Sequence, residues 1–341
     1  MKKYFQIIIW LCFLIFTVES QAQLEKRAQT GFKFLSVSTD ARVSGMGDAV
    51  TSLQHGYSSA MFYNPAGMAN MEKMVDAHFG HTQWIAGINY INYGIAIQPF
   101  KNDNYGVLGF SVVAVKYGDM QRTIKYDNEQ GYLDLGTFDP IAISMQLGYA
   151  KMLSNKFSIG GNIKWCQLSL GTHLVSYEDV GNNIPTKQEE FEQSSLAFDF
   201  GLIYQTGFKS LNLGMSVRNF SQEVKFIKEE FQLPLTFQVG VSMDMLDLFP
   251  SIDPKMHSFL LSVDAAHPRD FDEQLNIGCE YSFMDMVALR AGYTYPADER
   301  DFTFGAGVMK ELSGLLIGVD YSYSPFGVFD NVHRISVHVA Y

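Results

Sequence analysis

The chain has 341 residues, of which 47% are hydrophobic and 14% aromatic, and its 36 acidic and 25 basic side chains give a net charge of −11 at pH 7. This acidic balance argues against nucleic acid as a partner, because binding to phosphates needs clustered basic side chains. The 3 cysteines are too few for a disulfide framework or a thiolate metal site.

The first 22 residues have the pattern of a secretory signal peptide. Lys2 and Lys3 precede an apolar run over residues 4–18, and Ser20 and Ala22 supply the small residues of a cleavage site. The alternative is an uncleaved anchor helix, but the run is shorter than the roughly 20 residues that span a bilayer. We therefore predict that residues 1–22 are removed on export.

Residues 23–73 show no alternation of apolar and polar side chains. They are rich in Gly, Ala, Ser and Met, which predicts short helices and turns rather than strands. Within them, Asn64 precedes Pro65, which biases Asn64 away from helix, and Gly67 permits a tight turn.

From residue 74 onward, segments of about ten residues alternate strictly, as transmembrane strands do. In one of them Ile143 and Met145 alternate with Ser144 and Gln146. A soluble sandwich could contain one such strand, but these apolar faces are too many and too uniform for a soluble domain of this acidity. Fourteen strands are predicted, over residues 74–82, 88–99, 105–117, 140–151, 156–169, 194–206, 210–220, 233–244, 257–266, 273–282, 286–295, 301–310, 314–323 and 333–341.

The strand count and the connections predict an all-β fold, a 14-stranded antiparallel transmembrane β-barrel in the outer membrane of a Gram-negative cell. The number is even, as bacterial single-chain barrels require. Connections after odd-numbered strands include the long segments 118–139, 170–193 and 221–232, whereas most others are short turns. Short periplasmic turns and longer outside loops are typical of a barrel with both termini in the periplasm. Segment 245–256 is the exception and is interpreted as an ordered periplasmic excursion.

The last strand is predicted to act as the membrane-insertion signal. Ile335, Val337, Val339 and Tyr341 lie on one face and are expected to meet lipid. Because an open edge in lipid leaves backbone groups unpaired, this strand must close the ring against residues 74–82.

The lumen of such a barrel is too wide for wall side chains alone to fill. Residues 23–73 are therefore predicted to form an amino-terminal hatch inside it, with Asn64, Pro65, Ala66 and Gly67 buried against the wall, and residues 74–341 form the barrel.

Several ionisable side chains fall on the predicted inner face. Facing lipid, each charge would cost about 2–4 kcal/mol at mid-depth. One reading is a polar path or binding site; the other is that they pair across the lumen and with the hatch charges Asp40, Arg42 and Asp48. The inward set is Lys164, Asp199, Arg218, Asp264, Glu280, Arg290 and Asp320.

Six stretches of the chain form a recognisable combination: Gly31-Phe32-Lys33-Phe34-Leu35, Asp40-Ala41-Arg42, Gly45-Met46-Gly47-Asp48-Ala49, Tyr63-Asn64-Pro65-Ala66-Gly67, the stretch from Leu233-Pro234-Leu235 through Gly240, and Leu289-Arg290-Ala291-Gly292-Tyr293. They resemble the PorV/PorQ group, within the wider FadL-type family of outer-membrane transporters of hydrophobic compounds. The resemblance implies a hatch-plugged fourteen-stranded barrel that either serves type IX secretion or passes hydrophobic ligands sideways into the membrane.

No enzyme, cofactor or metal site is expected. The sequence has no Gly-x-Ser-x-Gly elbow, paired-His zinc motif or Walker loop. Cys166 is predicted to point into the lumen and Cys279 to lipid, so the two stay unpaired.

Two functions remain open, with outer-membrane lipid as a common partner. The first is a non-enzymatic factor in type IX protein secretion or cell-surface cargo handling, with secretion components or exported proteins as partners. The second is a FadL-like transporter of a hydrophobic small molecule. The predicted lumen face shows no excess of apolar side chains, which favours the first.

Overall fold

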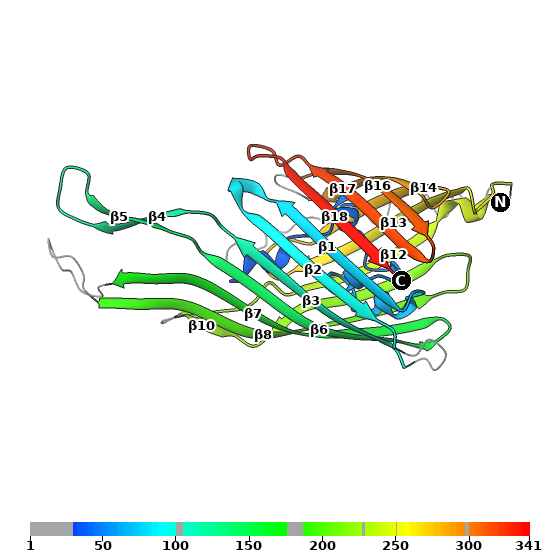
Figure 1. Ribbon diagram of the computed structural model, residues 1–341, viewed down its shortest axis with the longest axis horizontal. Coiled ribbons are helices and arrows are strands. Elements are labelled where there is room, and N and C mark those ends of the chain that lie inside the picture. Colours follow the sequence, from blue (N-terminus) through cyan, green and yellow to red (C-terminus); the bar gives the residue numbers. More distant parts are fainter. Residues whose placement is uncertain (1–29, 100–104, 176–186, 227–228, 250, 297–299) are drawn as a thin grey trace, which may run out of the picture.

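The computed structural model describes residues 30–99, 105–175, 187–226, 229–249, 251–296 and 300–341. Fourteen strands form one closed antiparallel barrel, in the order β1-β18-β17-β16-β15-β14-β13-β12-β9-β8-β7-β6-β3-β2 (Figure 1). Each of the fourteen predicted strands is confirmed. Their bounds are β1 Val75–Gln83, β2 Asn89–Ile97, β3 Val107–Lys116, β6 Ile141–Ser154, β7 Phe157–Val175, β8 Lys187–Gln205, β9 Asn212–Ser221, β12 Thr236–Asp244, β13 His257–Pro268, β14 Gln274–Phe283, β15 Val287–Tyr295, β16 Phe302–Leu312, β17 Leu315–Ser324 and β18 Val332–Ala340.

The ring closes between the first and the last strand, as the terminal pattern predicts. Asp76 of β1 lies opposite Ala340 of β18 in antiparallel register. Beyond the end of β18, the Tyr341 amide donates to the Val75 carbonyl at 2.8 Å, and the Val75 amide donates to the Tyr341 carbonyl at 2.9 Å. The barrel therefore has no open edge. No helix in the described ranges is both long and apolar enough to cross a membrane.

The exposed face of the wall is apolar and the buried face is polar or small. On β18, Ile335 is 50% exposed, whereas its neighbours Arg334 and Ser336 are buried. Tyr341, the residue that follows the end of β18, is 68% exposed. This inversion of a soluble core follows from lipid on the outside and protein on the inside. Cys166 is buried and Cys279 lies on the outward face of β14, and both are free thiols.

Three of the predicted outside loops contain strands that the sequence did not predict. β7 and β8 continue past the neighbouring strands, so much of segment 170–193 is a two-stranded arm, and β4 (Met120–Lys125) pairs with β5 (Tyr132–Phe138). A third pair joins β10 (Val224–Phe226) and β11 (Glu229–Phe231). β4, β5 and the β7–β8 arm project from one end of the barrel in Figure 1. Outside the hydrocarbon neither face has to be apolar, so alternation does not identify these strands.

The connection over residues 245–256 begins as a short 3-10 helix, η5 (Met245–Leu248). The Asp244 Oδ1 atom accepts from the Leu246 amide at 2.8 Å and caps this helix.

Residues 30–74, named here the amino-terminal segment, lie inside the barrel. The segment contains η1 (Lys33–Ser36), α2 (Ala41–Gly45), η2 (Ser58–Phe62) and η3 (Pro65–Asn70). α2 contacts β15 to β18, η2 contacts β1 to β3, and η3 contacts β6 to β8. One short segment can reach all these strands only from within the ring. The predicted signal peptide, residues 1–22, lies outside the described residues, as do residues 23–29.

We expect changes in the terminal strand to reduce insertion rather than ligand affinity. Val339→Lys places a charge on the lipid face at a cost of about 1 kcal/mol near the interface, and deletion of Tyr341 removes its two hydrogen bonds with Val75. The measurement is the membrane-inserted amount relative to wild type at equal expression. Val328→Lys is the matched control, because Val328 is 87% exposed in the connection between β17 and β18. Normal insertion of the Val339 variant with altered transport would contradict this assignment.

Candidate functional site in the barrel lumen

Asp40 organises the start of the buried helix α2. Its Oδ1 atom accepts from the Val43 amide at 3.1 Å, and its own amide donates to the Tyr63 hydroxyl at 3.0 Å. Its Oδ2 atom lies 3.7 Å from Nδ1 of His78 on β1. Asp40 therefore caps α2 and also joins it to η2 and the wall.

A row of buried charges attaches α2 to the wall. Arg42 makes a two-pronged contact with Glu280 of β14, at 2.9 Å through Nε and 2.8 Å through Nη2. Arg290 of β15 bonds the same carboxylate through Nε, and its Nη1 atom lies 2.6 Å from Oδ1 of Asp320 on β17. Two arginines thus alternate with two carboxylates, so each buried charge has an opposite neighbour.

His55 lies beside this row and stays neutral near pH 7. Its Nδ1 atom is 3.3 Å from Nη1 of Arg42. Burial, and then the positive charge of Arg42, lower the pKa of His55 to about 3.

Two further carboxylates hold the middle of the segment. Asp48 Oδ2 pairs with Arg300 Nη2 at 2.8 Å. On β13, Asp264 Oδ2 accepts from the Thr51 amide at 2.8 Å. Each contact joins the amino-terminal segment to a different part of the wall or its connections.

Asn64 and Pro65 lie against a flat part of the wall. The Asn64 side chain donates to the carbonyls of Thr51 at 2.6 Å and Leu202 at 3.2 Å, and its Oδ1 atom accepts from the Ala66 amide at 3.1 Å. The opposing wall residues are glycines: a β-carbon on Gly160 would lie 2.5 Å from the Ala66 nitrogen, and one on Gly201 would collide with the Asn64 oxygen. The close approach requires glycine at both wall positions.

Lys164 and Asp199 pair within the wall instead of reaching the segment directly. The Lys164 ammonium lies 3.0 Å from Asp199 and donates to Asn219 at 2.8 Å. The pairing of β8 with β9 shifts register at this point, and the Asn219 amide donates to Asp199 at 2.8 Å. Nearby, Arg218 donates to the Phe62 carbonyl at 3.1 Å. The structure therefore brings all seven inward charges into hydrogen bonds or ion pairs, but not into one cluster.

Sequence reasoning missed three anchors of the segment. Arg334 is fully buried, donates to the Ser38 carbonyl at 2.8 Å and lies 5.3 Å from the Trp84 ring centroid. Asp76 accepts from the Ser58 amide at 2.6 Å and pairs with His338 across the closing seam. Alternation along the last strand placed Arg334 and His338 inward and could have identified them.

The third missed anchor is Asp270, between β13 and β14. It accepts from the Thr30 hydroxyl at 2.6 Å and pairs with Lys33. A connection has no alternation, so the sequence contains no signal for this contact.

The lumen is more apolar at its outer end than expected. Phe32 and Phe34 pack with Tyr90, Val115 and Leu233 in a cluster of buried side chains. The sequence predicts no excess of apolar side chains on the inner face of the wall, and the cluster arises because strands, an outside connection and the segment itself each contribute to it. The cavity left beside Phe34 has a volume of only about 40 Å³, room for a few waters at most.

No group of three or more histidine, cysteine or acidic side chains is placed to hold a metal ion in the described part of the chain. In this part of the chain the lumen contains ion pairs and apolar contacts around the folded amino-terminal segment.

Comparison with known proteins identifies one family. The family model "Type IX secretion system membrane protein PorP/SprF" matches residues 49–339. This differs from the PorV/PorQ group that the hatch residues resemble, although both are linked to type IX secretion. No curated protein sequence matches the chain.

Solved structures with the same fold include hydrocarbon channels and a FadL homologue. CymD, a monoaromatic hydrocarbon channel, is 12% identical with a TM-score of 0.53, over 89% of this chain and 96% of its own. The Pseudomonas putida toluene transporter TodX is 13% identical, with a TM-score of 0.53 over 87% and 96%. A Pseudomonas aeruginosa FadL homologue is 13% identical, with a TM-score of 0.52 over 89% and 98%. At this identity the likeness establishes the fold alone.

We expect Glu280→Gln to destabilise the protein by about 3–5 kcal/mol, because it leaves Arg42 and Arg290 without their shared carboxylate. The measurement is the free energy of unfolding in urea, in detergent. Glu311→Gln is the matched control: Glu311 pairs with Lys73 at 2.6 Å, but its side chain is 56% exposed against 8% for Glu280. Loss of that pair should cost about 0–1 kcal/mol. Equal losses in the two variants would contradict the role given to the buried row.

We expect Gly160→Ala to loosen the amino-terminal segment, because the added methyl group overlaps Pro65 and Ala66. Overpacking of this kind costs about 1–3 kcal/mol. Limited proteolysis should then cut the segment faster than in wild type. Gly94→Ala is the control, since its β-carbon would meet nothing nearer than 3.6 Å. Unchanged protection in Gly160→Ala would show that the segment does not depend on this contact.

Proposed function

Because the chain belongs to the type IX secretion system membrane protein PorP/SprF family, we propose that it serves type IX protein export through its outside surface rather than through its lumen. It is an integral outer-membrane β-barrel. In this proposal residues 1–22 are removed on export, residues 23–73 form the hatch and residues 74–341 form the barrel. Its partners are secretion components or exported proteins.

The observation that supports a surface role is the filled lumen. The amino-terminal segment is bonded to the wall along its length, from Asp270 at one end through Glu280 and Asp264 to Leu202. The cavity beside Phe34 has a volume of about 40 Å³, too small for a polypeptide. A protein that passes the outer membrane must therefore use another route, and this barrel contributes contacts.

The strand pairs that project from the outer end of the barrel form a surface that a partner protein could bind. Aromatic rings connect the three outside strand pairs. The ring of Phe138 on β5 lies 4.6 Å from that of His173 on β7, and the ring of Phe191 on β8 lies 6.0 Å from that of Phe226 on β10, centroid to centroid. These contacts hold the projecting strands together. Rigid projecting strands are appropriate for protein recognition.

The lumen charges fit a structural rather than a catalytic use. Lys164, Glu280 and Arg290 are paired in the ion pairs described above. The cavity that Lys164 lines has a volume of only about 40 Å³. We infer a non-enzymatic protein without a cofactor.

A second candidate function is transport of hydrophobic compounds. The fold is that of TodX, a toluene transporter, and of CymD, a monoaromatic hydrocarbon channel. The apolar cluster around Phe32 and Phe34 is where such a compound would meet the hatch. In this chain those two rings occupy the space themselves, so transport would require the hatch to move.

A disulfide that locks the hatch separates the two functions. Ser44 of α2 and Ser324 of β17 lie with their hydroxyl oxygens 3.4 Å apart, so Ser44→Cys with Ser324→Cys can join hatch and wall. In cells lacking the native gene, we expect the oxidised double variant to restore cell-surface protein to the level of the reduced one. Toluene uptake is measured in the same cells.

Each single cysteine variant is the control for the substitutions themselves. Export lost only in the oxidised double variant would overturn the surface mechanism. Toluene uptake that depends on the gene and stops on oxidation would establish the transporter instead.

A further inference from the structure

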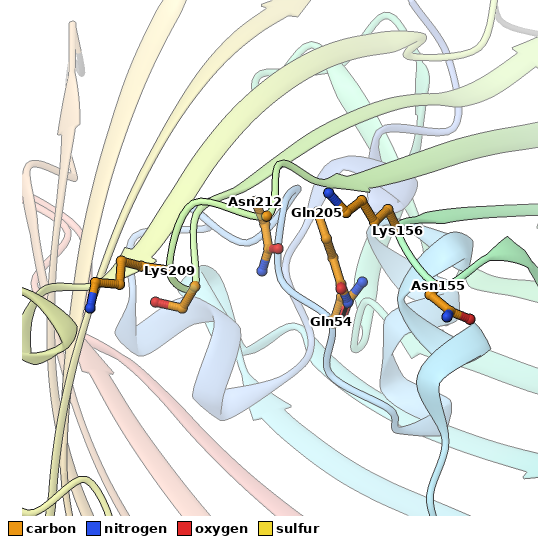
Figure 2. Close-up of a pocket in the computed structure, with 8 residues that line it drawn as sticks. Gln54, Asn155, Lys156, Gln205, Lys209 and Asn212 are labelled. Atoms are coloured by element: carbon orange, nitrogen blue, oxygen red, sulfur yellow. Dashed lines mark hydrogen bonds between the residues drawn. The ribbon is translucent and has the colours of Figure 1, made fainter.

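A polar pocket of about 380 Å³ lies between the amino-terminal segment and two turns of the wall. Figure 2 shows Gln54 of the segment pointing toward Gln205 of β8, with Lys156 and Asn155 from the turn between β6 and β7 close by. Lys209 and Asn212 line it from the turn between β8 and β9. The function proposed above makes no use of this pocket.

The pocket opens at the periplasmic end of the barrel. The strand pairing places the start of β7 beside the end of β8, and the end of β6 beside the start of β3. Followed around the ring to β1 and β18, this end is that of the carboxyl-terminal Tyr341. A barrel with short turns at this end has it in the periplasm.

Two lysines line the pocket, Lys156 and Lys209, and in Figure 2 the Lys209 ammonium points away from Gln54 and Gln205. Neither Lys156 nor Lys209 forms an ion pair within the described ranges. The Lys156 ammonium lies over Gly207, where a β-carbon would come within 2.5 Å of it. Asp247 of the adjoining connection accepts from the Ser210 amide at 3.1 Å and keeps its negative charge beside the pocket. The two lysines thus line a pocket with one neighbouring carboxylate, in a chain of strongly negative net charge.

Gln54 adds a donor that lacks an acceptor. Its Oε1 atom accepts from the Gln205 side chain, whereas its Nε2 atom is buried with no hydrogen-bond partner. A buried donor without a partner costs about 1–3 kcal/mol. An anion in the pocket would supply the acceptor that this donor lacks.

Apolar side chains lie beside the cationic turn. Phe208, between Gly207 and Lys209, is 60% exposed, and in the adjoining connection Phe249 is 55% and Leu248 45% exposed. Aromatic and basic side chains together at a barrel rim are typical of contact with the membrane interface.

We propose that this pocket binds the phosphate group of an anionic ligand, supplied by an inner-leaflet phospholipid headgroup or by a soluble phosphate ester. Lys156 and Lys209 supply charge, and Gln54 supplies a hydrogen bond from the hatch side. Lysine binds phosphate as a point charge, so the site needs no fixed fork geometry. A ligand held there would contact hatch and wall at once and would strengthen their attachment. This inference does not depend on the export function.

The test is lipid retention by the purified full-length protein. Native mass spectrometry in detergent measures binding of added phosphatidylglycerol, with phosphatidylcholine as the charge-neutral comparison. We expect one preferred phosphatidylglycerol, and about tenfold weaker binding in Lys156→Gln with Lys209→Gln, since an ammonium near an anionic headgroup contributes substantially to binding. Gln54→Leu should weaken binding without changing the rim charge.

The matched control is Lys255→Gln with Lys310→Gln, which removes two exposed lysines that do not line the pocket. Glycerol 3-phosphate separates the sources: binding at least as tight as that of phosphatidylglycerol identifies a soluble phosphate ester, and much weaker binding identifies the lipid headgroup. Equal binding of the two lipids together with no binding of glycerol 3-phosphate would overturn the site. So would equal losses in the pocket and control variants.

Discussion

Every backbone amide and carbonyl that crosses hydrocarbon must find its partner within the protein, and the rest of this structure depends on that constraint. Fourteen strands satisfy it only as a closed ring, which Val75 and Tyr341 complete with two backbone hydrogen bonds. Closure places one face of every strand in lipid. The polar side chains must then lie in the lumen or at the two ends of the barrel.

The width of the ring leads to the filling of its interior. Wall side chains of a fourteen-stranded barrel do not meet across the lumen, so the amino-terminal segment occupies the space. Its backbone lies so close to the wall that Gly160 and Gly201 face it where a β-carbon would overlap. Hydrogen bonds and ion pairs to the wall act together with apolar packing, because the segment also contributes Met61 and Met68 to one buried cluster and Val43 and Met46 to another.

The fold of this protein and its family point to different functions, and the segment that is hydrogen-bonded to the wall of the lumen bears on the difference. The fold is shared with CymD and TodX, which are described as a hydrocarbon channel and a toluene transporter, whereas the family is one of type IX secretion. The shared fold and the secretion family are compatible if a barrel with a hatch in its lumen no longer transports small molecules and acts through its outside surface. In this chain Phe32 and Phe34 pack against the wall at the outer end of the lumen.

The sequence by itself determined the fourteen strands, the closing pair and the inward facing of seven charged side chains, because a period of two residues in lipid is a local property of every strand. It did not determine the partners: Arg42 and Glu280 are 238 residues apart, and only the position of the segment inside the ring brings them together. The outside strands and Asp270 were missed because water, unlike lipid, imposes no alternation. Short motifs likewise suggested PorV/PorQ, while the match over residues 49–339 is to PorP/SprF. The outer apolar cluster and the periplasmic pocket each combine parts of the chain that are distant in sequence, so only the tertiary structure could decide them.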